Sequence, residues 1–296
     1  MPEPGQAFAW AEADELWDPW GMNDEQIRLW NEQNAPRWLA RRAEVTRAIT
    51  PHGLAGISAL APAAGERALD VGCGCGDTTL DLARRVGPEG AVVGIDVCEP
   101  FLAAARAEAA GWPNITYVGA DAQTHDFAEP FDLCFSRFGV MFFADPPTAF
   151  AKLRAGLRAG GRLALVVWGP VEVNEWAWLP LTVVRGHLDA PPPGPGPGPF
   201  SLADRNALGA LLRGAGFAEV RTEPVEITYL AGESIAAAAE LLLQFGPAAV
   251  ALRQAGAAGE ALRHRLEAKL AERLAGHGGP DGVRLRSVAT VATGRA

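Results

Sequence analysis

The stretch that most constrains the fold is the run ALDVGCGCGD at residues 68–77. It begins as a short buried strand, turns on three closely spaced glycines and enters a helix near Asp77. In a doubly wound α/β fold, a strand, a glycine-rich turn and a helix together present backbone N–H groups to a nucleotide-like ligand. Glycines suit such a turn because a Cβ would hold the ligand away and would oppose a positive φ. We therefore expect ligand contacts at Gly72, Gly74 and Gly76.

The spacing of these glycines separates two classes of ligand. A dinucleotide fingerprint, Gly-x-Gly-x-x-Gly, needs a glycine at position 77, where this chain has Asp77. A second carboxylate, Asp70, lies at the end of the strand. These two groups would repel a pyrophosphate, whereas a carboxylate attracts an ammonium or sulfonium by over about 1 kcal/mol when partly desolvated. The turn therefore favours a cationic nucleoside over NAD.

Composition narrows the functional class further. The 296 residues carry a net charge of −9 with no run of Lys or Arg, which argues against a nucleic-acid partner. No basic start followed by an apolar run and no uncharged apolar stretch of about 18 residues is present. We expect a cytoplasmic protein without a membrane span. The four cysteines lack further ligands at metal-site spacing, so we interpret them as buried thiols and expect no metal: Cys73, Cys75, Cys98 and Cys134.

The run LDVGCGCG at residues 69–76 resembles the first motif of class I S-adenosylmethionine-dependent methyltransferases. The resemblance continues from Ala68 to Trp168, with four strand-end signals in the family's order. Residues 123–143 look closest to the bacterial group related to ubiquinone and menaquinone C-methyltransferases. The resemblance implies S-adenosylmethionine as cofactor, methyl transfer to a small organic acceptor, and an α/β, Rossmann-like, doubly wound, mostly parallel seven-stranded sheet with an antiparallel last strand.

Acidic residues end two of the predicted strands. Asp96 closes the apolar strand 91–96 and is followed by Val97. Its spacing from the glycine turn suits a carboxylate that accepts both ribose hydroxyls, and a helix N-cap is the alternative. Asp121 follows the strand 115–118. The resemblance implies that Asp121 contacts the adenine amino group and that the N–H of Ala122 meets the ring, while a turn cap is the alternative.

A fourth strand ends near Phe135, so that Ser136 and Arg137 emerge at the carboxyl edge of the sheet. The resemblance implies that this segment reaches the methionyl end of the cofactor. Arg137 pairs either with a carboxylate of a ligand or with an acid near the turn. The expected cofactor-binding residues are Asp70, Gly72, Gly74, Gly76, Asp96, Val97, Asp121, Ala122, Ser136 and Arg137.

Four segments are expected along the chain. Residues 1–55 form an N-terminal arm and helical lid, in which one helix starts at Asn23 and a second runs from Pro36 to about Ile49. Residues 56–230 form the cofactor-binding core. Residues 231–280 carry amphipathic helices broken near a proline and form an inserted helical cap, and residues 281–296 form the last core strand.

The catalytic group is left open by the sequence. His125, His187 and Glu175 are candidates for a general base, and nothing in the sequence chooses among them. An NAD(P)-dependent oxidoreductase is a competing hypothesis, but neither Tyr117 nor Tyr229 has a lysine four residues later. A third hypothesis is a cofactor-binding, non-catalytic partner subunit, in which the cap would be an oligomer interface, for instance of a homodimer.

Overall fold

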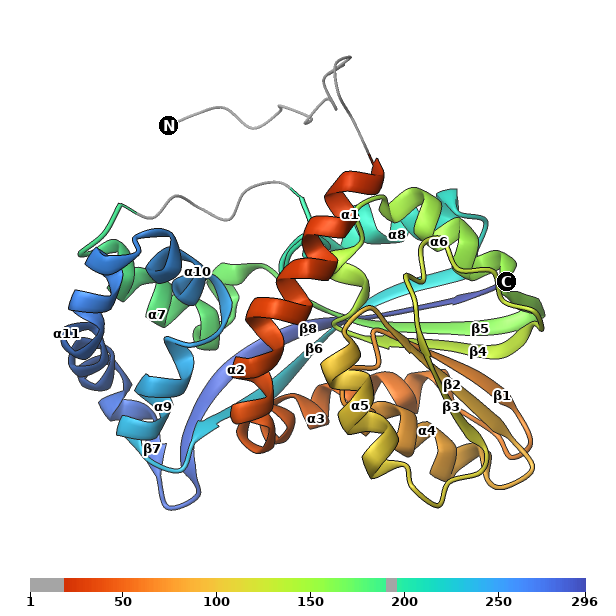
Figure 1. Cartoon of the computed structure of the whole chain (residues 1–296), viewed down its shortest axis with the longest axis horizontal. Helices are drawn as coiled ribbons and strands as arrows, with labels where there is room; N and C mark the ends of the chain where they lie inside the picture. Colours follow the sequence, from red (N-terminus) through yellow and green to blue (C-terminus); the bar gives the residue numbers. More distant parts are fainter. Residues whose placement is uncertain (1–18, 190–195) are drawn as a thin grey trace, which may run out of the picture.

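The computed structural model describes residues 19–189 and 196–296. Almost all of the predicted N-terminal arm lies outside these residues. A single sheet runs through the molecule, with strand order β3-β2-β1-β4-β5-β8-β6 (Figure 1). Its strands are β1 (Arg67–Val71), β2 (Ala91–Asp96), β3 (Ile115–Gly119), β4 (Phe131–Arg137), β5 (Leu157–Trp168), β6 (Ala218–Gly232) and β8 (Gly282–Arg295), and the two-residue β7 (Gly278–Gly279) pairs with β8.

The direction of the strands matches the prediction. β1 to β5 pair in parallel, and β8 is antiparallel to both β5 and β6. β1 lies between β2 and β4 in the sheet. Successive strands are added on one side of β1 up to β3 and on its other side from β4 onward. A ligand site is expected outside the carboxyl ends of the strands at such a switch point. The seven-stranded Rossmann-like sheet is confirmed, and the short β7 is an addition that the sequence did not reveal.

Helices cover both faces of the sheet (Figure 1). One face carries α3 (Arg42–Leu60), α4 (Asp77–Val86) and α5 (Glu99–Glu108), and the other carries α6 (Pro146–Ala155) and α8 (Arg205–Gly214). Side-chain caps fix two of the helix starts: Asp145 accepts the N–H of Thr148 at 3.2 Å, and Asp204 accepts that of Asn206 at 2.8 Å. Short 3₁₀ turns lie at Val140–Phe142, Val171–Val173 and Ala275–His277.

The N-terminal helices differ from the prediction. α1 (Pro19–Arg28) continues through a π-helical segment, Leu29–Asn34, into α2 (Ala35–Ala40), and the break comes at Arg41 instead of Pro36. α3 then passes Ile49 and includes Pro51. A proline inside a helix favours a break, but close packing of α3 on the sheet keeps the helix intact through Pro51. The packing is so close that a Cβ at Gly56 would lie only 2.4 Å from Val166 Cγ2. The division expected at residue 55 therefore falls inside α3.

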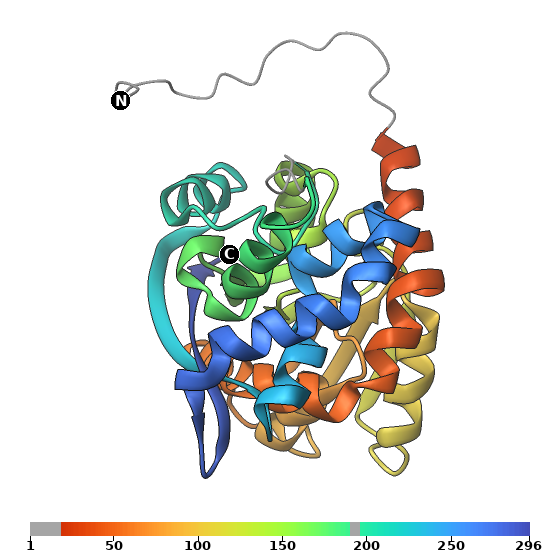
Figure 2. The same cartoon turned by 90° about the vertical axis from the view of Figure 1, so that its left-hand side faces the viewer.

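Four helices gather at one end of the sheet, on the left of Figure 1 and in front in Figure 2: α7 (Glu175–Arg185), α9 (Ile235–Leu242), α10 (Gly246–Gln254) and α11 (Ala257–Leu274). The last three come from the predicted cap segment, and their first break precedes Pro247. α7 joins them from an earlier part of the chain and packs against α10 and α11. Two ion pairs of 2.9 Å tie this group to the N-terminal helices, Arg41 with Glu240 and Arg47 with Glu233.

No single helix among the described residues has the length and apolar composition needed to cross a membrane. Within that part of the chain, α9 and α10 taken together reach this length and composition, but they are bent by 60° relative to each other.

Candidate functional site

A cavity of about 1260 Å³ lies outside the carboxyl ends of the central strands. Its walls come from the glycine turn, the ends of β2 and β4, the N-terminal helices α1 to α3, and α10 of the cap. Pockets for drug-sized ligands have volumes of roughly 300–1,000 Å³. The cavity therefore has room for a nucleoside-sized ligand and a second small molecule.

The glycine turn is shaped by close backbone packing. Gly72 has a φ of +66°, and a Cβ on it would lie 2.7 Å from the Cα of Gly139. A Cβ on Gly76, with a φ of +84°, would lie 2.3 Å from Tyr117 Oη. Gly74 also has a positive φ, of +55°, but no atom lies within 4 Å of its Cβ position. Gly72 and Gly74 line the cavity, whereas Gly76 holds the turn against Tyr117.

Asp96 joins the turn to the next strand. One carboxylate oxygen accepts the N–H of Gly74 at 2.8 Å, and the other accepts the N–H of Cys98 at 2.9 Å. Asp96 lines the cavity, and its burial raises its pKa above the ordinary value, opposed by these N–H groups. The N-cap position of α5 belongs to Cys98, so Asp96 is not itself the cap. The neighbouring Val97 also lines the cavity.

Asp70 does not face the cavity as the sequence argument expected. Its side chain is fully buried beneath the turn, where Oδ2 accepts hydrogen bonds from Thr78 Oγ1 at 2.8 Å and Thr79 Oγ1 at 2.7 Å. Burial raises its pKa to about 6, and the two hydroxyls oppose the shift. Asp70 thus anchors the first turn of α4 instead of offering its charge to a ligand.

Asp121 lies at the far end of the cavity, next to α1. Asn23 donates to its Oδ2, and the backbone N–H of Gln123 donates to its Oδ1 at 3.0 Å. Ala122 lines the same wall. The turn cap considered for Asp121 is present, and its side chain still borders the cavity. Asn23 was expected to start a helix, but α1 begins earlier. The side chain of Asn23 lines this wall of the cavity instead.

The end of β4 places its two expected residues differently. Ser136 is fully buried and does not line the cavity, whereas Arg137 does. Arg137 packs beside Gly53 of α3, where a Cβ would lie 3.0 Å from its Cδ. Burial lowers the pKa of Arg137, opposed by Asp77 and Asp70. Within the described residues no carboxylate lies within 4.0 Å of its guanidinium, which leaves it available to a ligand.

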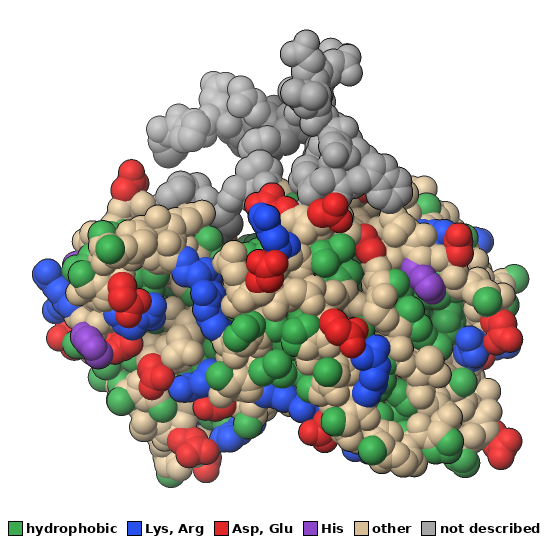
Figure 3. Space-filling model, in the orientation of Figure 1, with side chains coloured by type: hydrophobic (Ala, Val, Ile, Leu, Met, Phe, Trp, Pro, Cys, Tyr) green, Lys and Arg blue, Asp and Glu red, His purple; other side chains and the backbone are tan. Residues whose placement is uncertain are grey.

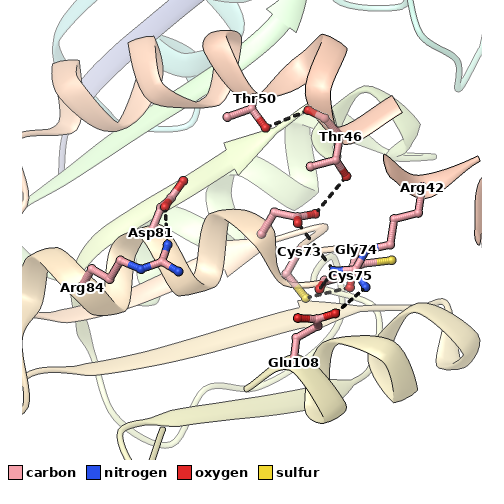
Figure 4. A network of polar contacts seen from close by, with 10 residues as sticks. Arg42, Thr46, Thr50, Cys73, Gly74, Cys75, Asp81, Arg84 and Glu108 are labelled. Carbon is pink, nitrogen blue, oxygen red and sulfur yellow. Dashed lines mark hydrogen bonds and ion pairs between the residues drawn. The ribbon is translucent and has the colours of Figure 1, made fainter. Parts of the chain in front are cut away.

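α3 lies over the glycine turn and contacts it through polar side chains, shown in Figure 4. Arg42 donates to the carbonyl of Cys75 at 3.4 Å and pairs with Glu108 at 3.2 Å. Thr46 Oγ1 donates to Asp77 Oδ2 at 3.4 Å, and Arg42 pairs with the same carboxylate at 3.6 Å. The helix expected to act as a lid is therefore fastened to the turn at Asp77.

Two aromatic groups line the rest of the cavity, and the sequence did not reveal that they meet. The first lies near the turn and consists of Trp30, Trp38, Phe101 and Phe142. The second lies between the sheet and the cap and consists of Phe138, Trp168, Trp176, Phe200 and Tyr229. The nine tryptophans of the chain were the only signal for them, because their members come from distant segments.

His52 of α3 supports the second aromatic group from behind. Its ring is fully buried against Trp168, with ring centroids 4.9 Å apart. Ser287 donates its hydroxyl to the carbonyl of Ile227 at 2.6 Å, so its oxygen accepts from His52 Nε2 at 2.8 Å. Nδ1 has no hydrogen-bond partner. The imidazole is therefore neutral, and burial lowers its pKa to about 4.

This burial makes His52 an acid-sensitive element of the fold. The unfolded chain takes up its proton near pH 6.5 and the folded chain only near pH 4, so the contribution of His52 to the free energy of unfolding falls as the pH drops through this window. The loss is on the order of 3 kcal/mol. The raised pKa of Asp70 acts in the opposite direction. Urea unfolding between pH 4 and pH 8 measures the net change. Relative to its value at pH 8, the free energy of unfolding at pH 4 should be higher for His52→Gln than for the wild type, whereas His264→Gln, which changes an exposed histidine, should follow the wild type; a His52→Gln profile parallel to that of the wild type would contradict the assignment.

None of the three candidate bases lines the cavity. The His125 ring packs on Phe127, with centroids 5.1 Å apart. His187 Nδ1 lies 3.1 Å from the carbonyl of Val183. Glu175 Oε2 accepts the N–H of Arg286 at 2.6 Å, which ties the start of α7 to β8. The structure thus gives these three residues structural contacts and no place beside a bound substrate.

The comparisons with known proteins agree with the fold. A family model described as a methyltransferase domain matches residues 68–161. The nocamycin O-methyltransferase of Saccharothrix syringae is 37% identical over 176 residues, which cover 54% of this chain and 62% of that protein. The 2-phytyl-1,4-naphtoquinone methyltransferase of Thermosynechococcus vestitus is 32% identical over 171 residues, covering 54% of this chain and 76% of that protein. The chain belongs to the class I S-adenosylmethionine-dependent methyltransferases.

A solved structure supports the same fold for this methyltransferase. The YcgJ protein from Bacillus subtilis superposes with a TM-score of 0.54 at 15% identity, and the match covers 83% of this chain and 98% of that one. In sequence, this chain matches only about three-fifths of the length of the nocamycin enzyme. The family model ends at residue 161. Both the cap and the N-terminal helices lie outside the segment that the family model matches.

Proposed function

We propose that this methyltransferase transfers a methyl group from S-adenosylmethionine to a small organic acceptor held between the sheet and the helical cap. The single observation that carries the proposal is the continuity of the cavity, which runs from the glycine turn to the aromatic group under the cap. The names of both relatives point to small organic compounds, nocamycin and a substituted naphthoquinone. The predominantly apolar lining suits an acceptor of that kind.

The residues at the turn fit the cofactor. Gly72 and Gly74 leave their side of the cavity without a Cβ, so that a ligand can approach the backbone. Asp96 faces the cavity beside them and is proposed to accept the ribose hydroxyls. Asp121 and Ala122 would meet the adenine, and Arg137 the carboxylate at the methionyl end. Asp70, Gly76 and Ser136 are proposed to position the turn without touching the cofactor.

The chain's contribution to the reaction is mainly orientation and the exclusion of water. S-adenosylmethionine supplies a methyl group on a positively charged sulfur, which leaves as a neutral thioether. The lid helices and the cap close the cavity with aromatic side chains, so a nucleophile held there is desolvated and aligned with little competition from water. Tyr229 lies in this wall with a buried hydroxyl whose raised pKa disfavours its ionisation, so it is a hydrogen-bond donor.

Parallel calorimetric titration with S-adenosylmethionine, S-adenosylhomocysteine and NADH tests the assignment. We expect micromolar binding of the first two and none of NADH. Binding of NADH alone would support the oxidoreductase hypothesis and overturn the proposed roles at the turn. Binding of the cofactor without turnover on a panel of phenols, carboxylic acids and quinols would favour the non-catalytic partner. The cytoplasmic location and a homodimer formed through the cap remain predictions.

A further inference from the structure

Two arginines from different segments meet where the lid and the cap face each other. Arg37 lies on α2 and Arg253 lies at the end of α10. Both are half-buried and line the large cavity. Together with Gln244 they also line a neighbouring cavity of about 1020 Å³ between α2 and the cap helices. Their side chains therefore stand at the junction of the two cavities.

Neither arginine has an acidic partner among residues 19–189 and 196–296. The glutamates around the neighbouring cavity each have another partner: Glu240 pairs with Arg41, Glu260 pairs with Arg263, and Glu267 lies 3.3 Å from Nδ1 of His264. The Nη1 atom of Arg37 is buried without a hydrogen-bond partner. Burial lowers the pKa of Arg253, and the charge of Arg37 lowers it further. The two guanidiniums therefore repel each other without compensation.

Such an arrangement is costly unless an anion occupies it. A buried charge that lacks a partner destabilises a fold, whereas a carboxylate between two guanidiniums gains strong, charge-assisted hydrogen bonds. The other charged residues that line the large cavity are mostly acidic: Asp77, Asp96 and Asp121 lie with Arg137 at the cofactor end, and Glu172 also borders the cavity. A molecule that is apolar in the middle and anionic at one end would fit the aromatic walls and the two arginines together.

Aromatic side chains beside the two arginines lead to the part of the cavity that we assign to the methyl acceptor. Trp38, next to Arg37, contacts Phe245 with ring centroids 5.6 Å apart. Gly246 follows Phe245, and a Cβ on it would lie 2.9 Å from the ring of Trp176. The helix that carries Arg253 thus begins against the aromatic group assigned to the acceptor. Acidic and basic side chains are interspersed over the face of the molecule shown in Figure 3.

We propose that Arg37 and Arg253 together bind a carboxylate of the methyl acceptor, so that the substrate is an apolar or aromatic acid and not its neutral counterpart. This inference rests on the proposed function, because it assigns the acceptor to the same cavity. The cofactor also carries a carboxylate, and the experiment must separate these two sources.

The test uses 1-hydroxy-2-naphthoate and its methyl ester as probes, titrated into protein with and without saturating S-adenosylhomocysteine. We expect the acid to bind at least about tenfold more tightly than the ester. Arg37→Gln and Arg253→Gln should each remove that preference while leaving the affinity for S-adenosylhomocysteine within twofold. Arg263→Gln, which removes a paired arginine from the neighbouring cavity, is the matched control and should change neither.

Equal binding of acid and ester, or no binding of the acid, would overturn the inference. A parallel loss of S-adenosylhomocysteine affinity in both variants would assign the arginines to the cofactor's carboxylate and overturn it too. Wild-type protein that fails to bind S-adenosylhomocysteine contradicts the proposed function instead, and the acid preference can still be measured without it.

Thermal unfolding of the ligand-free protein gives a second readout. Arg253→Gln relieves the repulsion from Arg37, so its midpoint should equal or exceed that of the wild type. A midpoint lower by several degrees would show that Arg253 has a structural partner and would contradict the inference.

Discussion

Replacing Gly72 with alanine should reduce the affinity for S-adenosylhomocysteine by at least about 100-fold, or roughly 2.7 kcal/mol. The new Cβ would lie 2.7 Å from the backbone of Gly139, and two backbone segments cannot separate without displacing the ends of β1 and β4. The φ of +66° adds a cost of about 1–2 kcal/mol for a residue with a Cβ. The Cβ also stands in the wall where the cofactor is proposed to lie. Isothermal titration calorimetry measures the loss.

Gly65→Ala is the matched control for this substitution. Gly65 has a φ of +81° but no atom within 4 Å of its Cβ position, and it precedes β1 at the opposite edge of the sheet. It should lower the unfolding midpoint by a few degrees and leave the affinity unchanged. Equal affinity losses in both variants would mean that backbone strain and not the close approach at Gly72 governs binding. Circular dichroism of Gly72→Ala separates lost binding from lost folding.

Much of the site could be predicted because it is local in sequence. The glycine turn, Asp96 and Asp121 each follow directly from a strand, and parallel strands bring their carboxyl ends to one edge. The mostly parallel sheet with its antiparallel last strand was implied by the family resemblance, and alternating strands and helices leave few topologies. The order of the strands comes from the structure. The side chains of α1 to α3 were harder to place, because Asn23 and Thr46 act through residues about 98 and 31 positions away.

The failures share one physical cause. Asp70 was assigned to a ligand on charge alone, but its side chain lies inside the core, where two threonines in the first turn of α4 donate to its Oδ2. His125, His187 and Glu175 were considered because of their chemistry, and each is held by a contact away from the cavity. Whether a polar side chain meets a neighbour or a ligand depends on packing between distant segments, which spacing in one sequence does not report.

Asp96→Ala should weaken binding of S-adenosylhomocysteine at least about tenfold, or roughly 1.4 kcal/mol. Two effects add. The substitution leaves the N–H groups of Gly74 and Cys98 without their acceptor, so the turn loses its link to β2. It also removes the carboxylate that we propose accepts the ribose hydroxyls. Calorimetric titration at fixed salt concentration gives the affinity directly.

Asp132→Ala separates these effects from a general loss of stability. Asp132 also accepts a backbone N–H, that of Arg67 at 2.7 Å, and pairs with Arg158, but it lies at the start of β4, on the edge of the sheet away from the cavity. Removing its carboxylate should lower the free energy of unfolding and leave the affinity for S-adenosylhomocysteine unchanged. Adenine alone, which has no ribose, should bind the Asp96→Ala protein as well as the wild type. If S-adenosylhomocysteine also keeps its full affinity for that variant, binding needs neither the link from the turn to β2 nor the carboxylate, and the ribose role must be given up.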